Sequence, residues 1–400
     1  SIFTTGNYTN LSATNNSLLY IDDGIFHMEA TEALFQQGGE KVDDGNGGFT
    51  VAGFHFTPYN GNNNILTAPM IDPKIIDKAK MEDYIAEQKA MNAIILEDTE
   101  DKKSFISFGL YAQALSIFTK IEEDKYEYET RIVNCKDCYN LTITGDKTSQ
   151  IVLNGAITGY SAVNLDGDTN VFLGSGSPIK DYKFNVNAGV LNNPIVEANG
   201  HLIVSSKGTV NDATINTGGS LTASSYARIT NLLAKAESNL DIDKSAILAG
   251  NIVIDKTANL SGDYDYDKIF DKKENDSGSL TLMGGINEEL AKKTNSLINE
   301  SSSKSLNLID GEYNIVKEKQ EIAGWEQLTL SGAKVKLDKE IEVFSPAKLI
   351  NIANNSEFNL AGDSPLVTTI TGSINNDGTL NFHHSLDDAD DIVTIQGNYK

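Results

Sequence analysis

Residues 189–264 repeat a nineteen-residue pattern: in lines of that length they read GVLNNPIVEANGHLIVSSK, GTVNDATINTGGSLTASSY, ARITNLLAKAESNLDIDKS and AILAGNIVIDKTANLSGDY. Aliphatic residues and turn residues each recur in fixed columns. The aliphatic columns are Leu191, Val210, Ile229 and Leu248; Val196, Ile215, Ala234 and Val253; and Leu202, Leu221 and Leu240, with Leu260 displaced by one residue. The turn columns are Asn193, Asp212 and Asn231, then Gly200 and Gly219. Asn and Gly suit turns because they tolerate positive φ, so each line predicts short strands separated by tight turns.

Such short strands cannot bury an apolar face alone. Stacking equivalent strands of successive coils, about 4.8 Å apart, gives that face a covered core and pairs the backbone groups. A β-sandwich would have longer strands and would lack a constant repeat. The sequence therefore predicts an all-β fold, a right-handed parallel β-helix (a solenoid) with short helical insertions.

The same alternation continues on both sides of the repeat. Its segments are 141–143, 151–153, 163–165 and 184–186 upstream, and 328–330, 335–337, 358–360 and 380–382 downstream. Four regions are predicted. They are a β-rich N-terminal region (1–135) with a helical insertion at about 72–97, the nineteen-residue-repeat β-helix (136–261), an acidic and helical insertion (262–305), and a C-terminal β-helix (306–400).

The composition excludes several classes of partner. A formal charge of −24 repels nucleic acid and anionic bilayers. Only Arg131 and Arg228 are arginines among 32 basic residues, so few planar forks for phosphate are present. No apolar run approaches the roughly 20 residues of a membrane span, so no membrane insertion by this segment is expected. The sequence starts at Ser1 without a basic and apolar leader segment, and we expect that a signal peptide has been removed.

Two segments carry a family resemblance. The repeat TVNDATINTGGSLTASS (209–225) is similar to that of the AIDA and antigen-43 type self-associating autotransporters, and DDADDIVTIQGNYK (387–400) resembles the junction before the autochaperone region of such passengers. The repeat match covers about a fifth of the chain. The resemblance implies a passenger domain secreted to the bacterial cell surface across the outer membrane, by type V secretion, with a C-terminal translocator barrel that is not in this sequence.

The function implied is adhesion. The expected partners are the same protein on neighbouring cells, giving aggregation and biofilm, or a receptor or glycan on a host surface. The alternatives are a glycan- or protein-binding virulence factor that does not self-associate, and a secreted toxin or hydrolase on a β-helix scaffold. No resident cofactor and no enzymatic activity are expected.

Cys135 and Cys138 form a C-x-x-C pair, which can be half a zinc site, a redox motif or a local disulfide. There is no second C-x-x-C, and the flanks indicate strands instead of the helix that a redox motif needs. A local disulfide of an exported protein is favoured, and closely spaced cysteines suit the resembling family.

Asp72-Pro73 predicts the start of a helix, with the aspartate as its cap. Ile75, Ala79, Ala86, Ala90 and Ile94 then recur at helical spacing. This helix either presents a binding surface or covers the open N-terminal end of the solenoid. The covering role is favoured because exposed sheet edges need protection.

The second insertion contains DYDYDKIFDKKE. Its carboxylates are Asp263, Asp265, Asp267, Asp271 and Glu274, and their spacing nearly matches an EF-hand calcium loop. Lys268 stands where that loop requires glycine, and a strand precedes it instead of a helix. A solvated acidic loop is favoured, with calcium as the alternative.

Catalytic patterns are weak, and no catalytic residue is predicted. GSGSP around Ser175 resembles the nucleophile motif of serine-protease passengers, but glycine replaces its aspartate, and the surroundings of His27 and His55 do not match a partner base. Arg131 follows an acidic run that resembles a solvated strand face more than a lyase site. The adjacent His383 and His384 would point to opposite faces of a strand, so a surface turn is favoured over a metal site.

Overall fold

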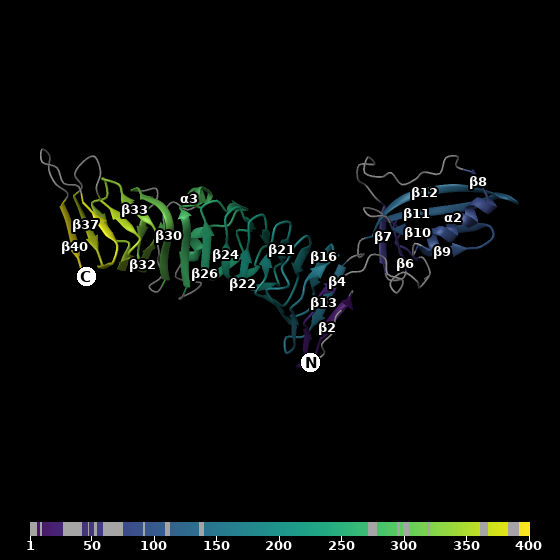
Figure 1. The fold of residues 1–400 in the computed structure, drawn as a ribbon, viewed down its shortest axis with the longest axis horizontal. Coiled ribbons are helices and arrows are strands. Elements are labelled where there is room, and N and C mark those ends of the chain that lie inside the picture. The colour runs from purple at the N-terminus through teal and green to yellow at the C-terminus, as the bar shows by residue number, and fades with distance from the viewer. Residues whose placement is uncertain are drawn as a thin grey trace. The chain divides into compact units, whose positions relative to one another are not determined.

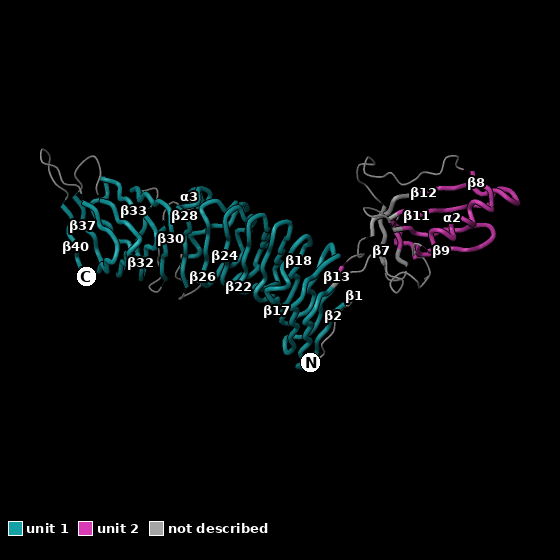
Figure 2. Tube along the Cα trace, viewed as in Figure 1, with its two compact units in different colours: residues 1–26, 141–400 teal, residues 27–140 magenta. Residues whose placement is uncertain are grey.

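The first residues of the chain already belong to the β-helix, because Leu11 pairs in register with Ile143 and Ile25 with Ile157. The computed structural model describes residues 6–8, 10–26, 42–46, 48–51, 54–58, 75–90, 93–108, 113–135, 140–270, 278–293, 297–298, 304–317, 321–360, 367–382 and 392–400. The chain forms two compact units (Figure 2). The solenoid unit comprises residues 1–26 and 141–400, and the inserted unit comprises residues 27–140.

The solenoid unit is a right-handed parallel β-helix, as predicted, and its coils stack along one axis (Figure 1). Two sheets and three short ladders surround the core. The long sheet contains β3 (Leu18–Ile21), β14 (Gln150–Leu153), β17 (Asn170–Leu173), β19 (Val190–Asn192), β20 (Ile195–Val196), β22 (Thr209–Ile215), β24 (Arg228–Ala234), β26 (Ile247–Asp255), β28 (Gly278–Gly285), β30 (Lys304–Ile315), β32 (Trp325–Ser331), β33 (Lys334–Leu337), β35 (Ala347–Ile352), β36 (Glu357–Asn359), β38 (Ser373–Asn376) and β39 (Thr379–Asn381).

The second sheet and three short ladders complete the coils. The second sheet contains β2 (Asn10–Ala13), β13 (Asn140–Gly145), β16 (Ala162–Leu165), β18 (Lys183–Val186), β21 (His201–Val204), β23 (Ser220–Ala223), β25 (Asn239–Ile242) and β27 (Asn259–Ser261). The short ladders are β1 (Gly6–Asn7), β4 (Ile25–Phe26) and β15 (Ile157–Thr158); β29 (Leu297–Ile298) and β31 (Ile322–Ala323); and β34 (Val343–Phe344), β37 (Val367–Thr371) and β40 (Ile392–Gln396). The first ladder leads into the second sheet, whereas β31 and β34 lead into the long sheet.

The register confirms the first aliphatic column. Leu191 pairs with Val210, Val210 with Ile229, and Ile229 with Leu248, at steps of nineteen residues. Each of these side chains is at most 5% exposed. Because each coil places a similar side chain directly above the last, the core is one continuous stack of aliphatic columns.

The second column is wrong at one residue. Ala234 pairs with Ile254 instead of Val253, and Ile254 is fully buried whereas Val253 is half-buried on the outer face. The register shifts between Thr230 and Leu232, where the facing strand β26 carries one extra residue. The same extra residue explains the displacement of Leu260, which pairs with Leu240.

The turn column is confirmed, because Asn193, Asp212 and Asn231 all have φ between 57° and 61°. Gly200 and Gly219, by contrast, are needed for space. A Cβ on Gly200 would lie 2.0 Å from the carbonyl oxygen of Ile179 in the preceding coil. The positive φ at this corner belongs to the residue before each of them, Asn199 or Gly218.

The inserted unit has a different architecture, an antiparallel sheet covered by one helix. Its elements are β5 (Val42–Asp43), β6 (Phe49–Val51), β7 (Phe54–Pro58), β8 (Ile75–Asp77), α2 (Lys78–Ala90), β9 (Ile94–Asp98), β10 (Lys102–Phe108), β11 (Gln113–Glu122) and β12 (Lys125–Cys135). Met81 and Ile85 of the helix pack on Phe105, Phe118 and Tyr128 of the sheet. The helix thus has a core of its own within this unit.

These elements correct the predicted start of the helix. Asp72 and Pro73 lie outside the described residues, and Ile75 lies in strand β8, 50% exposed, instead of on a buried helix face. Ile94 is buried, but in strand β9. The helix begins only at Lys78.

The boundaries of the two compact units differ from those of the four predicted regions. Residues 1–26 form coils of the solenoid unit, whereas the sequence pattern predicts that they belong to an N-terminal region that extends to residue 135. Within 262–305, strand β28 continues the long sheet by pairing with β26 and β30. The short elements around it are a 3-10 helix, η2 (Tyr266–Phe270), and α3 (Glu288–Lys293).

Candidate functional site

The outer face of the long sheet carries rows of polar side chains that bond from coil to coil. Asn211 Nδ2 donates to Asn192 Oδ1 at 2.9 Å. Nearer the C-terminus, Asn307 Nδ2 donates to Thr281 Oγ1 at 3.1 Å and Asn375 Nδ2 to Asn351 Oδ1 at 3.1 Å. These residues alternate with buried aliphatic ones along each strand, so strand geometry turns them outward. We call them the amide rows.

Similar rows follow the second sheet and the corners. Asn185 Nδ2 donates to Asn164 Oδ1 at 2.7 Å, and Asn231 Nδ2 donates to Asp212 Oδ1 at 2.8 Å. His201 Nε2 lies 2.8 Å from Thr222 Oγ1 on the second sheet. Burial, and the neighbouring charge of Lys183, lower the pKa of His201 below its ordinary value, which favours a neutral ring at pH 7. Both sheets therefore carry rows of amide and hydroxyl groups that bond from coil to coil, with charged side chains among them.

Sequence reasoning missed the amide rows although a signal was present. Asn192 and Asn211 stand one residue after Leu191 and Val210 in the aligned repeat, so the inward column predicts an outward one beside it.

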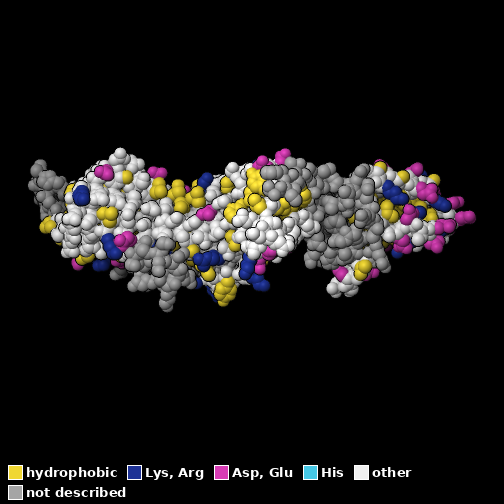
Figure 3. Space-filling model, turned by 90° about the horizontal axis from the view of Figure 1, so that it is seen from below, with side chains coloured by type: hydrophobic (Ala, Val, Ile, Leu, Met, Phe, Trp, Pro, Cys, Tyr) yellow, Lys and Arg dark blue, Asp and Glu magenta, His cyan; other side chains and the backbone are white. Residues whose placement is uncertain are grey.

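Figure 3 shows one face of the molecule, on which uncharged surface covers much of the solenoid and charged side chains are scattered.

A pocket of about 340 Å³ lies between the short ladders β29–β31 and β34–β37–β40. β29 pairs with β31, and β34 pairs with β37, but β31 and β34 of successive coils are in different sheets. The two coils meet just beyond the break, where the backbone N–H of Trp325 donates to the Pro346 carbonyl oxygen at 2.9 Å. No sequence pattern indicated this interruption.

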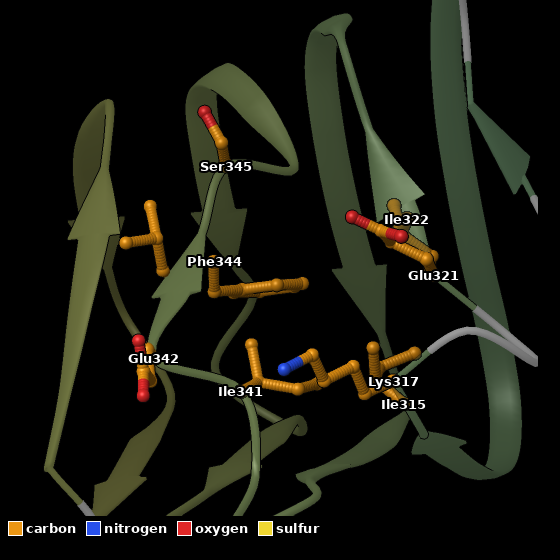
Figure 4. A pocket seen from close by; sticks show the side chains of 9 residues that line it. Ile315, Lys317, Glu321, Ile322, Ile341, Glu342, Phe344 and Ser345 are labelled. Carbon is orange, nitrogen blue, oxygen red and sulfur yellow. The ribbon is translucent and has the colours of Figure 1, made fainter.

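Apolar and charged side chains share the pocket wall (Figure 4). Ile322 of β31 and Phe344 of β34, two strands that do not pair with each other, are almost fully buried. Lys317, Glu321 and Glu342 are exposed and charged. The described wall thus suits a small group with an apolar body.

The five carboxylates of the calcium hypothesis are only partly described. Asp271 and Glu274 lie outside the described residues, so the hypothesis stays a prediction. Asp263 Oδ1 accepts the backbone N–H of Lys244 at 2.8 Å, and Asp265 Oδ1 accepts that of Asp267 at 3.1 Å. Burial raises the pKa of Asp267, as does the charge of Asp265. Two of the three described carboxylates therefore already bond to backbone of the solenoid.

The side chains of this segment also contribute to the core. Tyr264 and Tyr266 alternate with the three aspartates, are at most 2% exposed, and form an edge-to-face ring pair with centroids 5.0 Å apart. Among the described residues, no group of three or more His, Cys, Asp or Glu side chains is placed to hold a metal ion.

The remaining sequence candidates are placed as follows. Ser175 lies in an exposed turn after β17, whereas Ser177 is buried and its Oγ donates to the carbonyl oxygen of Leu153 at 3.0 Å. Cys135 ends β12 and Cys138 lies outside the described residues, so the disulfide stays a prediction. Arg131 and His55 are in strands β12 and β7, with side chains that are not described. His27, His383, His384, Asp387 and Asp388 lie outside the described residues.

No helix among the described residues combines the length and apolar character needed to cross a membrane. Comparisons of the chain with family models, with curated proteins and with solved structures found no match. The fold and the described surfaces are therefore the basis for any functional proposal.

Proposed function

We propose that this chain is a bacterial surface adhesin whose solenoid binds copies of itself on neighbouring cells through the amide rows. The supporting observation is the repetition of neutral side chains along the rigid solenoid, such as Asn211 on Asn192 in one row and Asn375 on Asn351 in another. Amides both donate and accept hydrogen bonds, so an amide row is complementary to another amide row. The sequence resemblance to self-associating passengers, which implies display at the cell surface, agrees with this proposal.

Multivalency makes such contacts effective. One exposed polar contact contributes little, but a rigid array engages many contacts after the first has formed. Coils spaced about 4.8 Å apart hold the amides within each row in register, so two rods that align at one coil of a row align at the next coil of that row. The proposal assigns binding, and no catalytic step, to the outer faces.

Charge sets the conditions under which two copies associate. The chain carries a formal charge of −24, so two parallel copies repel one another at low ionic strength. At 0.1 M salt, exposed charges more than about 10 Å apart are largely screened from one another. Short contacts between neutral groups do not depend on this screening. Clumping of cells that display the chain is therefore expected to increase as salt is raised from low concentration.

The test is settling of cells that display the full chain, measured by turbidity over time at several salt concentrations. Asn211→Asp, Asn307→Asp and Asn351→Asp are combined in one variant. Each change removes an amide donor and adds a negative charge to an amide row, so settling is expected to slow strongly.

A matched control adds three carboxylates at exposed corners instead: Ala198→Asp, Ser206→Asp and Ser224→Asp. Equal surface display is checked by antibody binding to whole cells. If both variants slow settling equally, overall charge and not the amide rows controls it. If cells displaying the unaltered chain never clump at any salt concentration, self-association is refuted.

A further inference from the structure

The first coils of the solenoid carry aromatic side chains where later coils carry amides. On the outer face of the long sheet, Tyr20 pairs in register with Val152, and Val152 pairs with Phe172. All three are partly exposed, while Ile151 and Val171 beside them are fully buried. The next member of this outward column is Asn192, through pairing of Phe172 with Asn192. The aromatic members of this column are thus Tyr20 of β3 and Phe172 of β17, with Val152 of β14 between them.

Amide side chains flank these apolar ones. Gln150 and Asn170 are register partners that precede Val152 and Phe172 by two residues, on the same outer face. Asn154 follows Val152 by two residues and is exposed. The N-terminal patch is defined as Tyr20, Gln150, Val152, Asn154, Asn170 and Phe172.

One carboxylate borders this patch. Asp22 Oδ1 accepts from the hydroxyl of Tyr20 at 3.1 Å and from Asn154 Nδ2 at 2.9 Å. These bonds hold two members of the patch in place across adjacent coils. The bond to Asp22 also raises the pKa of Tyr20 above its ordinary value, so the hydroxyl stays a donor at neutral pH. The six members of the patch themselves carry no charged side chain.

We propose that the N-terminal patch binds a neutral oligosaccharide. Sugar rings have an apolar C–H face that packs on Tyr20 and Phe172, and hydroxyl groups that both donate to and accept from the amides of Gln150 and Asn170. Because the patch spans three coils, its apolar and amide side chains follow one another along the rod, so they can contact successive units of a chain of linked sugars.

Electrostatics selects the neutral ligand. The patch has no cation to pair with a uronate, a sialate or a sulfate, and Asp22 at its border repels all three. A second copy of this chain would bring the same negative charge to the patch. A neutral glycan pays no such penalty, and its hydroxyls match the amide and phenol groups present.

The test uses the purified full chain, without cells, so its outcome is independent of the self-association proposed above. The probes are immobilised cello-, malto-, manno- and chito-oligosaccharides, with oligouronates as charged counterparts. Binding to at least one neutral series and not to the uronates is expected. Phe172→Ala is expected to weaken that binding on the order of tenfold, as loss of an aromatic packing surface does.

Leu233→Ala is the matched control, because Leu233 is also an outward, partly exposed apolar residue of the long sheet but lies in a later coil. It is expected to leave binding unchanged. Gln150→Ala, at an exposed position, provides a second variant should Phe172→Ala fold poorly; it is expected to weaken binding several-fold. No binding to any neutral probe at millimolar concentration, preference for uronates, or equal losses in the Leu233 and patch variants would each overturn the proposal.

Discussion

The two units of the chain are stabilised by different side-chain chemistry. Among the described residues, the inserted unit contains ion pairs such as Lys103–Asp98 at 2.6 Å and Lys120–Glu100 at 2.6 Å, together with an aromatic cluster. The solenoid unit joins successive coils mainly by amide and hydroxyl bonds over aliphatic columns, with the Lys348–Glu326 ion pair at 2.6 Å as an exception. The inserted unit thus depends on one local core, whereas the solenoid distributes its stability over many similar contacts.

This difference shows how repetition changes the choice of side chain. A charged group repeated at every coil would face its own copy about 4.8 Å away and be repelled. An asparagine meeting its own copy gains a hydrogen bond, because its amide has both a donor and an acceptor. The antiparallel sheet pairs unlike residues, so Lys103 can face Asp98 directly.

The largest expected effect is on the inserted unit alone. Phe118 is fully buried, and its ring centroid lies 4.7 Å from that of Tyr128. Phe118→Ala is expected to cost about 3–5 kcal/mol and to unfold this unit selectively. Trp325 is the only tryptophan, is 1% exposed and lies in the solenoid, so its fluorescence reports that unit. The urea midpoint measured by Trp325 fluorescence should stay constant, whereas a shift would show that the units unfold together.

A cavity created in the core of the solenoid should, in contrast, shift the urea midpoint measured by Trp325 fluorescence. Ile229 is fully buried between Val210 and Leu248 of the adjacent coils. Ile229→Ala is expected to lower the free energy of unfolding by about 2–5 kcal/mol and to move the Trp325 midpoint. Thr230→Ala, one residue on and facing outward, is the control and should stay within about 0.5 kcal/mol. Equal effects of the two variants would contradict the stacked core.

The corner of each coil should show a smaller effect. Asn231 has φ of 61° and donates to Asp212, and its Oδ1 accepts the backbone N–H of Asn251 at 2.9 Å. Asn231→Ala loses these bonds and strains the backbone, at a cost of about 1–3 kcal/mol. Asn231→Gly keeps the backbone relaxed and should cost less. The reverse order in urea titrations would mean that backbone strain is unimportant here.

The smallest effect is the response of the solenoid to acid. The Thr148 hydroxyl and the backbone N–H of Asn15 hold the pKa of Asp146 at about 2, below its ordinary value of 3.8. A lowered pKa in the folded state stabilises the fold above the ordinary pKa, and this contribution is lost as pH falls from about 4 to about 2.

Asp146→Asn should therefore flatten the pH dependence of the Trp325 urea midpoint over that interval. Asp98 of the inserted unit, whose pKa Lys103 and Lys89 lower, provides the comparison. Asp98→Asn should leave the Trp325 midpoint and its pH dependence unchanged. Identical profiles for the original chain and the Asp146→Asn variant would show that this carboxylate does not link the first two coils.

The solenoid could be predicted from sequence because its buried residues recur at a constant spacing along the chain. Leu191, Val210 and Ile229 identify an inward column without knowledge of distant contacts. The prediction for Val253 was wrong because β26 contains one more residue than the strand it pairs with, and Gly250 takes the next turn position in the column of Asn231. A pattern with a constant spacing of nineteen residues cannot show at which position of a strand an extra residue is inserted.

The inserted unit could not be predicted in the same way. Its strands pair β10 with β11 and β11 with β12, and nothing repeats. Ile75 and Ile94 fit helical spacing, but pairing with other strands places them in β8 and β9. The pocket beside Phe344 arises from a missing strand pair, which leaves no mark in the local sequence.

The place where the inserted unit leaves the solenoid has a thermodynamic consequence. The chain passes from β4 to β13 of the second sheet between Phe26 and Asn140, and the next coil passes from β15 to β16 with residues 159–161 alone. A whole unit thus occupies the site of a three-residue turn. The entropic cost of closing a loop grows only slowly with its length, so a turn of this kind tolerates a long insertion while the strands on either side keep their pairing.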